Sequence, residues 1–507
     1  MMGILWPLLI SWLTGAAIVW SCWAAVREGP RAVLLMLCLS LLAGLAISSC
    51  TAYVSMLLFP RSFGASLAVE LAILLGAIGV FISRRMRYGR VLILKRTSID
   101  RASPKRRWLI LGATLLLAVA AVACVVQSYL AERAVTQIYP HGDYDAWQFW
   151  NLRARCIFRE GSLDRRFFAP PLNPISHPLL LPMTIVRGWN WDGTDSPRIA
   201  AALSILFGML TPFTLFGGIL WLRGGFTAAL ATIVLLSPWG FPVHCGTQLA
   251  DAPIGVFMIA AVILAAGGLR KANGRHGLFF LSGLMTGAAA WTKNEGLLFC
   301  VLMGASVFLA VTWRRAFAVG IREFLAFSCG AGLIILFVAH FRLTLTTACP
   351  AGLGHELSGS WTSIFDASRH RTIFQVFQMT SPRTFDESIF PWCLAYAAII
   401  WIAGLFAGVK PGNVLKGGGG FAGTVALLTI SGYYAVLLVT PHDLYTLLCA
   451  ALCRLLLQLW PLAVLGFFLC LPALEELLHK EKESGEGGAI YRRNSHIRRR
   501  GSLKRAT

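Results

Sequence analysis

Charged side chains are scarce in this chain. They make up 13% of its 507 residues, whereas hydrophobic residues make up 57%. A soluble domain carries roughly a quarter of its residues as Asp, Glu, Lys or Arg. Apolar runs of roughly 20 residues, the length that crosses a bilayer, recur along most of the sequence. The composition therefore excludes an ordinary soluble protein and predicts an all-α, many-pass integral membrane protein.

Motifs for metals and nucleotides are also lacking. The 13 cysteines form no C-x-x-C pair and no Cys/His cluster, so we expect them to be small buried side chains. No Walker A sequence is present, and Gly418-x-Gly420-x-x-Gly423 matches a dinucleotide fingerprint by letter only, because no strand precedes it. No cofactor is therefore expected, and a divalent metal has no ligand cluster to support it.

Hydropathy predicts about thirteen spans of roughly 20 residues each. The eighth and ninth are short and close enough to form a hairpin, and Pro461 offers a place for a kink in the last. The approximate cores of the expected spans are 4–26, 32–58, 64–83, 109–131, 198–221, 225–243, 249–269, 278–292, 297–312, 323–341, 389–408, 420–439 and 446–474.

The formal net charge is +22, and the Lys and Arg residues lie mainly in the connections between these spans and in the C-terminal tail. The connection 84–108 is rich in Lys and Arg and holds one acidic residue, Asp100, and the tail 475–507 is similarly basic. This distribution is typical of cytoplasmic segments of membrane proteins, and it explains the charge without nucleic acid as a partner. We expect an N-terminal extension at 1–108, a main membrane domain at 109–474 and a cytoplasmic tail.

Alternation along the chain then predicts which segments lie on the outer face. The first and longest of these is the loop 132–197, and the polar residues with the most chemical promise fall on the same side. The other outer segments are 244–251, 293–295, 342–388 and 440–445.

The loop 132–197 opens with two carboxylates, Asp143 and Asp145, on either side of Tyr144. From Ala146 onward the spacing predicts an interfacial helix, with Trp147 and Trp150 on its apolar face. Asp145 would then be the N-cap residue. The spacing leaves open whether this carboxylate only caps the helix or also does chemistry, since an anchored carboxylate remains ionised and well oriented.

Other outer residues each have a structural and a functional interpretation. His177 is either a surface residue or a contact to an acceptor or phosphate. Asp251, at the start of a span, either interacts favourably with the helix dipole or binds a ligand. Arg454 inside the last span needs a buried carboxylate or a lipid phosphate as its partner. The candidate substrate-binding residues are Tyr144, Arg155, His177, Asp251, Lys293, Glu295, His442, Asp443 and Arg454.

The order of several short elements resembles bacterial GT-C-fold glycosyltransferases, which are related to the protein O-mannosyltransferases and the aminoarabinose lipid A transferases. The elements are Asp145-Ala146-Trp147, Ala154-Arg155, His177-Pro178 and 291–296, and the resemblance covers roughly 109–474. It implies a long first outer loop whose acidic residue is the catalytic base, matched by Asp145 and less well by Asp143. The Asp-Glu pair of the mannosyltransferases is missing, because Ala146 follows Asp145.

The resemblance implies transfer of a sugar from a polyprenyl-phosphate donor to an acceptor hydroxyl, with inversion, at the outer face of a bacterial inner membrane. Arg155, Lys293 or Arg454 would offset the charge of the leaving phosphate. The acceptor class stays open among glycan, lipid and protein. The alternatives are an O-antigen-type ligase or polymerase that uses the loop 342–388, and a secondary transporter or lipid flippase.

Overall fold

The computed structural model describes residues 2–23, 29–88, 104–169, 177–271, 275–314, 317–346, 361–380, 402, 412 and 418–472. Within these residues every regular element is a helix and no strand occurs. Ten helices are long and apolar enough to cross a membrane, or eleven if the helix pair α8–α9, which is bent by 73°, is counted as one span. The prediction of an all-helical, many-pass membrane protein is therefore confirmed for the described part of the chain.

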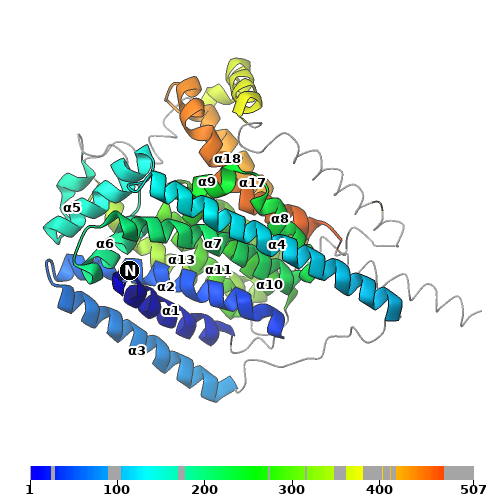
Figure 1. Cartoon of the computed structure of the whole chain (residues 1–507), viewed down its shortest axis with the longest axis horizontal. Coiled ribbons are helices and arrows are strands. Elements are labelled where there is room, and N and C mark those ends of the chain that lie inside the picture. Colours follow the sequence, from blue (N-terminus) through cyan, green and yellow to red (C-terminus); the bar gives the residue numbers. More distant parts are fainter. Residues whose placement is uncertain are drawn as a thin grey trace, which may run out of the picture.

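The helices form one elongated bundle with a group of shorter helices at one end (Figure 1). The bundle helices are α1 (Met2–Trp23), α2 (Val33–Leu58), α3 (Phe63–Tyr88), α4 (Pro104–Ile138), α7 (Pro197–Leu222), α8 (Gly225–Leu236), α9 (Gly240–Gly246), α10 (Asp251–Arg270), α11 (Arg275–Thr292), α12 (Glu295–Arg314), α13 (Phe317–Thr344), α17 (Gly420–Val439) and α18 (Leu444–Cys470). The short elements are η1 (Pro30–Ala32), η3 (Ala146–Asn151), α5 (Leu152–Glu160), η4 (Arg165–Phe168), α6 (Leu180–Asp192) and η5 (Trp361–Phe365).

The expected count of about thirteen spans is not reproduced in full. The expected span 278–292 is helical as α11, but its polar start keeps it outside the set of helices apolar enough to cross a membrane. The expected span 225–243 is broken into α8 and α9, because Pro238 between them cannot donate a backbone N–H to a continuing helix. The expected span 389–408 lies outside the described residues, apart from residue 402. The last span is a single helix that passes through Pro461.

Helix α10 lies at the centre of the bundle. Every residue from Asp251 to Leu269 is buried, and α10 packs against α7, α11 and α18. Its 20 residues give a length of about 30 Å, which matches the thickness of the hydrocarbon layer. By contrast, only 11% of the apolar window is buried in α3 and in α4, so these two helices expose apolar surface at the periphery. The N-terminal helices α1 and α2 pack on α6, α7 and α11 and share one core with them.

Glycines allow the closest helix crossings. A Cβ atom on Gly44 of α2 would lie 1.8 Å from the carbonyl oxygen of Ser11 in α1, and one on Gly15 would lie 1.7 Å from the carbonyl oxygen of Ser40. In the same way, Gly283 of α11 and Gly330 of α13 each meet a backbone carbonyl of the other helix. Small residues of this kind let helix backbones approach in a membrane, where the surrounding lipid is as apolar as the side chains.

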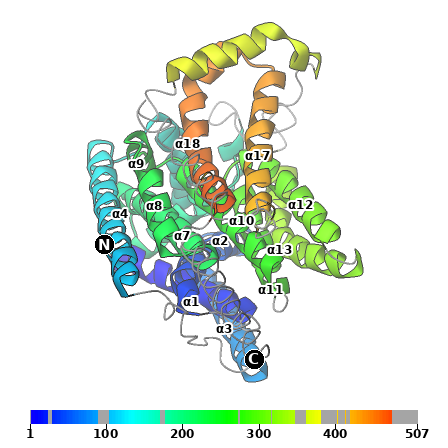
Figure 2. The same ribbon diagram turned by 90° about the vertical axis from the view of Figure 1, so that its right-hand side faces the viewer.

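Residues 361–380 lie across one end of α17 and α18, as the yellow and orange ribbons of Figure 2 show. Arg369 donates hydrogen bonds to the carbonyl oxygens of Leu437 and Thr440, and Ile373 and Val376 pack in an apolar cluster with residues of α17 and α18. This part of the expected loop 342–388 is therefore folded against the last two helices.

Candidate functional site: a charged network at one end of the bundle

Several polar side chains meet at one end of the bundle, which we call the network end. It is the end at which α4 stops and at which α10 and α12 begin. We define the charged network as Asp145, Asp251, Lys293, Glu295 and Arg454, which ion pairs connect into one chain of contacts. Arg454 lies about 15 Å from Leu444 and about 24 Å from Cys470 along α18, so the network lies nearer one end of that helix.

Asp251 is the centre of the network. The Lys293 ammonium donates to its Oδ1 over 2.8 Å, and the Arg454 Nε donates to its Oδ2 over 3.3 Å. The His244 Nε2 lies 3.2 Å from the same Oδ2. The side chain of Asp251 is fully buried. A buried carboxylate needs such partners, because an unpaired charge in an apolar interior is costly.

Lys293 connects the centre of the network to two further groups. Its Nζ lies 2.8 Å from Oε1 of Glu295 and 3.4 Å from Oε1 of Gln458, and Gln458 in turn donates to the hydroxyl of Tyr433. Burial by itself would lower the pKa of Lys293, but the carboxylates of Asp251 and Glu295 more than offset this and raise the pKa above its usual value. Lys293 is therefore a fixed positive charge inside the protein.

Asp145 joins the network through Arg454: the Nη1 of Arg454 donates a hydrogen bond to the Oδ2 of Asp145. The predicted capping role is wrong: Asp145 has helical backbone angles and its side chain makes no cap hydrogen bond. About a quarter of each side chain in this pair is exposed, 28% for Asp145 and 22% for Arg454. The carboxylate that the sequence favoured for chemistry is therefore partly accessible, as is that of Glu295, which is 25% exposed, whereas Asp251 is buried.

The backbone around Asp145 is held by one residue of the α9–α10 link. The side-chain Nε2 of Gln248 donates to the carbonyl oxygens of Tyr139 and Pro140, and its Oε1 accepts from the side-chain Nδ2 of Asn151. Asp143 N–H also donates to the carbonyl oxygen of Thr247. Gln248 has a φ of 64°, in the left-handed region that side chains other than glycine seldom adopt. These contacts fix the segment that carries Asp145 close to the start of α10.

The helix after Asp145 differs from the expected interfacial helix. Residues Ala146–Asn151 are wound as a π-helix, and α5 follows without a break. Trp147 is 46% exposed, but Trp150 is buried and faces the protein, where its ring stacks on His177. The predicted apolar stripe therefore divides, with one Trp turned outward and the other packed in the core. Short π-helical stretches of this kind are frequent at functional sites.

His177 lies close to the network. Its carbonyl oxygen accepts a hydrogen bond from Arg153, and its Nδ1 is buried with no hydrogen-bond partner among the residues that the structure describes. Burial lowers the pKa of His177 well below its ordinary value, and the nearby charges of Lys293, Arg153 and Arg454 lower it further. The ring is therefore neutral at physiological pH and offers a free nitrogen beside the network.

The other candidate residues from the sequence lie outside the network. Asp143 accepts from the backbone N–H of Tyr144, and Tyr144 is exposed and packs edge-on against Trp147. The guanidinium of Arg155 forms an ion pair with Asp195 over 3.0 Å, outside the charged network.

The last two candidates lie at the start of α18. Asp443 caps this helix by accepting a hydrogen bond from the N–H of Thr446, and His442 lies in the same turn. Among the described residues, the contacts of Asp143, Tyr144, Arg155 and Asp443 are thus made with groups outside the charged network.

Three polar residues in or beside the network were missed in the sequence. His244, Gln458 and Tyr433 lie within helices whose neighbours are apolar, so single polar letters in an apolar run were the available signal. Arg342 at the end of α13 also reaches the network end, where it donates to Asn294 over 2.7 Å. Across the described residues, no group of three His, Cys, Asp or Glu side chains is placed to hold a metal ion.

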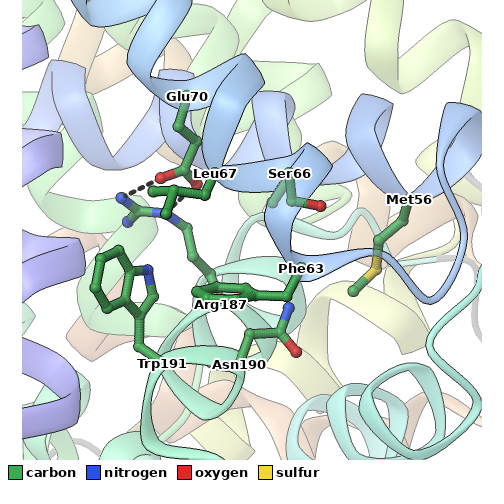
Figure 3. Close-up of a pocket in the computed structure, with 9 residues that line it drawn as sticks. Met56, Phe63, Ser66, Leu67, Glu70, Arg187, Asn190 and Trp191 are labelled. Carbon is green, nitrogen blue, oxygen red and sulfur yellow. Dashed lines mark hydrogen bonds and ion pairs between the residues drawn. The ribbon is translucent and has the colours of Figure 1, made fainter.

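A pocket lies apart from the network, between α2, α3 and α6 (Figure 3). The guanidinium of Arg187 pairs there with Glu70 and also donates to Ser11 Oγ and to the carbonyl oxygen of Pro7. The contacts of Arg187 thus tie the peripheral helix α3 and the first helix to α6. We assign this buried ion pair a structural role.

Comparison with known proteins gave no match. No protein-family model, no curated protein and no solved structure matches the chain.

Proposed function

We propose that the chain is a glycosyltransferase that moves a sugar from a polyprenyl-phosphate donor to an acceptor hydroxyl, with Asp145 as the base. The observation that carries the proposal is the charged network. It combines an accessible carboxylate with two fixed cations at one end of a membrane bundle. This combination suits a reaction in which a hydroxyl loses a proton while a phosphate on a lipid leaves.

The proposed reaction is a single displacement at the anomeric carbon. The acceptor oxygen forms a bond to this carbon while its proton passes to the carboxylate of Asp145. The bond from the anomeric carbon to the phosphate oxygen breaks, and its electron pair leaves with the polyprenyl phosphate. The sugar configuration is inverted, because the acceptor attacks the face opposite the phosphate.

Arg454 and Lys293 would offset the charge on the leaving phosphate. Both are already positioned by Asp251, so little rearrangement is needed when charge develops. The Nδ1 of His177 is buried beside the network without a hydrogen-bond partner among the described residues, so donor binding would have to expose it before it could make a contact. The lipid tail would lie among the membrane helices, and we place the reaction at the outer face of a bacterial inner membrane, opposite the basic connection 84–108.

The two alternatives have less support from the contacts. A ligase that works through the loop 342–388 would use Arg369 and His370, but these side chains are engaged with backbone carbonyls and with Tyr434. A secondary transporter is expected to hold its ionisable groups near the middle of the bilayer. Here the first residue of α10 is the centre of the network.

The proposal is tested by transfer assays on the purified full chain in detergent, with a panel of polyprenyl-phosphate sugars and hydroxyl acceptors. We expect Asp145→Asn to lower turnover by a factor of about 10² to 10⁴, the usual effect of losing a positioned base. The matched control is Glu160→Gln, which removes a carboxylate from an exposed ion pair with Arg61 outside the network. Activity with nucleotide sugars alone, or full activity of Asp145→Asn, would refute the proposal.

A further inference from the structure

The charged network has a buried part and an accessible part. The side chains of Asp251 and Lys293 are at most 6% exposed, and their ion pair is shielded from water. The Asp145–Arg454 pair is the accessible part, with about a quarter of each side chain exposed. An ion pair that water reaches contributes little to stability, whereas breaking a buried pair is costly. Glu295 is also 25% exposed, but its partner Lys293 is buried. Asp145–Arg454 is therefore the pair of the network in which water reaches both side chains, and the one that a ligand can open.

Asp145 has little else to hold its side chain. Among the residues that the structure describes, Arg454 is the one side-chain partner of this carboxylate. Gln248 holds the backbone before Asp145 at Tyr139 and Pro140 and the side chain of Asn151 after it, so the Asp145 side chain can leave Arg454 without moving the helix. Arg454 would stay in place, because its Nε donates to Asp251.

The charge balance of the network sets a condition for a bound phosphate. The network contains three carboxylates and two cations, so it has no spare positive charge for another anion. The phosphodiester of a polyprenyl-phosphate sugar carries one negative charge. If it replaces the carboxylate of Asp145 on Arg454, one anion is exchanged for another and the guanidinium remains neutralised. Guanidinium binds phosphate as well as carboxylate, and both in a planar, bidentate manner.

We infer that the donor phosphate and Asp145 compete for Arg454, so that the base is released only when the donor has bound. The inference rests on the proposed function and adds an order of events to it. In the resting network the Oδ2 of Asp145 accepts a hydrogen bond from the Arg454 guanidinium, so this oxygen is not free to meet the acceptor hydroxyl. Once the phosphate occupies Arg454, Asp145 is free to accept the proton of the acceptor hydroxyl. The resting network thus keeps the base inactive until a donor is present.

The test measures binding rather than transfer, with a polyprenyl phosphate that carries no sugar. Its affinity for the purified full chain in detergent is measured by calorimetry. We expect Asp145→Asn to bind about fivefold more tightly than the natural chain, because the competing carboxylate is gone. Asp145→Glu, which keeps the charge, is expected to bind like the natural chain. Glu160→Gln, which neutralises an exposed carboxylate away from the network, is expected to leave the affinity unchanged.

The gain must depend on Arg454. In an Arg454→Gln background, which we expect to bind more weakly, adding Asp145→Asn should produce no gain. A gain in affinity that persists without Arg454, or an Asp145→Asn affinity equal to that of the natural chain, would overturn the inference.

Inorganic phosphate is the second ligand, and we expect it to bind more weakly than the lipid phosphate. Equal affinities would overturn the assignment of a lipid-borne phosphate.

The inference and the proposed function can fail separately. A fivefold gain in lipid phosphate binding without any sugar transfer would support the competition at Arg454 and refute the transferase reaction. Transfer by the natural chain without the gain in Asp145→Asn would support the reaction and overturn the order of events.

Discussion

Asp251 holds together groups from three separate parts of the chain. His244 comes from α9, Lys293 from the link between α11 and α12, and Arg454 from α18. None of these contacts can be read from spacing, because the partners lie 7, 42 and 203 residues away along the sequence. The sequence did identify Asp251, Lys293 and Arg454 as candidates, since charged residues in or beside apolar spans are costly and need a reason. Which of them pair with each other required the fold.

We therefore predict that Asp251→Asn lowers the stability of the protein by about 3 to 5 kcal/mol, because it leaves Lys293 and Arg454 without their buried counterion. The measurement is the thermal unfolding midpoint in detergent. Adding Lys293→Met to this variant should recover part of the loss in stability, since it removes one of the two cations that lost Asp251 as their counterion. Glu160→Gln, from an exposed pair, should change the midpoint little. A wild-type midpoint for Asp251→Asn would show that the network is not needed for stability.

At the scale of single elements, the helix predicted from residue spacing differs most from the observed structure around Asp145. The spacing of Asp145, Trp147 and Trp150 predicted a capped helix on the membrane surface, and a helix does occur there. The capping failed because Arg454 offers the carboxylate a charged partner that backbone N–H groups cannot match. Trp150 turned inward because the ring of His177 stacks on it. Both reasons lie far away in sequence, so periodicity could not supply them.

Glycine positions give a second test at this scale, because the chain has glycines in crowded and in open surroundings. A methyl group on Gly44 would meet the carbonyl oxygen of Ser11 in α1, so Gly44→Ala should force α1 and α2 apart and lower the unfolding midpoint. We expect a loss of about 1 to 3 kcal/mol, as for other overpacked positions. Gly76 in α3 has nothing within 4 Å of an added Cβ. Gly76→Ala should therefore leave stability unchanged or raise it slightly, since alanine favours helix. Equal midpoints for the two variants would contradict the crossing.

At the scale of the whole molecule, the hydropathy pattern predicted the architecture better than its details. Long apolar runs fixed the helical, many-pass class, because a span needs both length and low charge. The hydropathy pattern passed over Pro238, where α8 and α9 are bent by 73°, and over Arg275 and His276, with which α11 begins. It also did not reveal that residues near 370 pack on α17 and α18, since that contact joins apolar residues far apart in the chain.

The orientation in the membrane is the prediction on which the proposed chemistry depends. Arg87 and Tyr144 are both exposed, and α4 separates them along the chain: Arg87 lies in the last turn of α3, within the basic connection 84–108, and Tyr144 follows α4. Positive charge favours the cytoplasm, so a cysteine at 144 should react with a membrane-impermeant maleimide in intact cells. A cysteine at 87 should react only after the cells are permeabilised. The natural chain, labelled in parallel, corrects for its own cysteines, of which Cys329 and Cys449 are exposed in the described part of the chain. The reverse pattern would put Asp145 on the cytoplasmic side, where a donor held in the outer leaflet could not reach it.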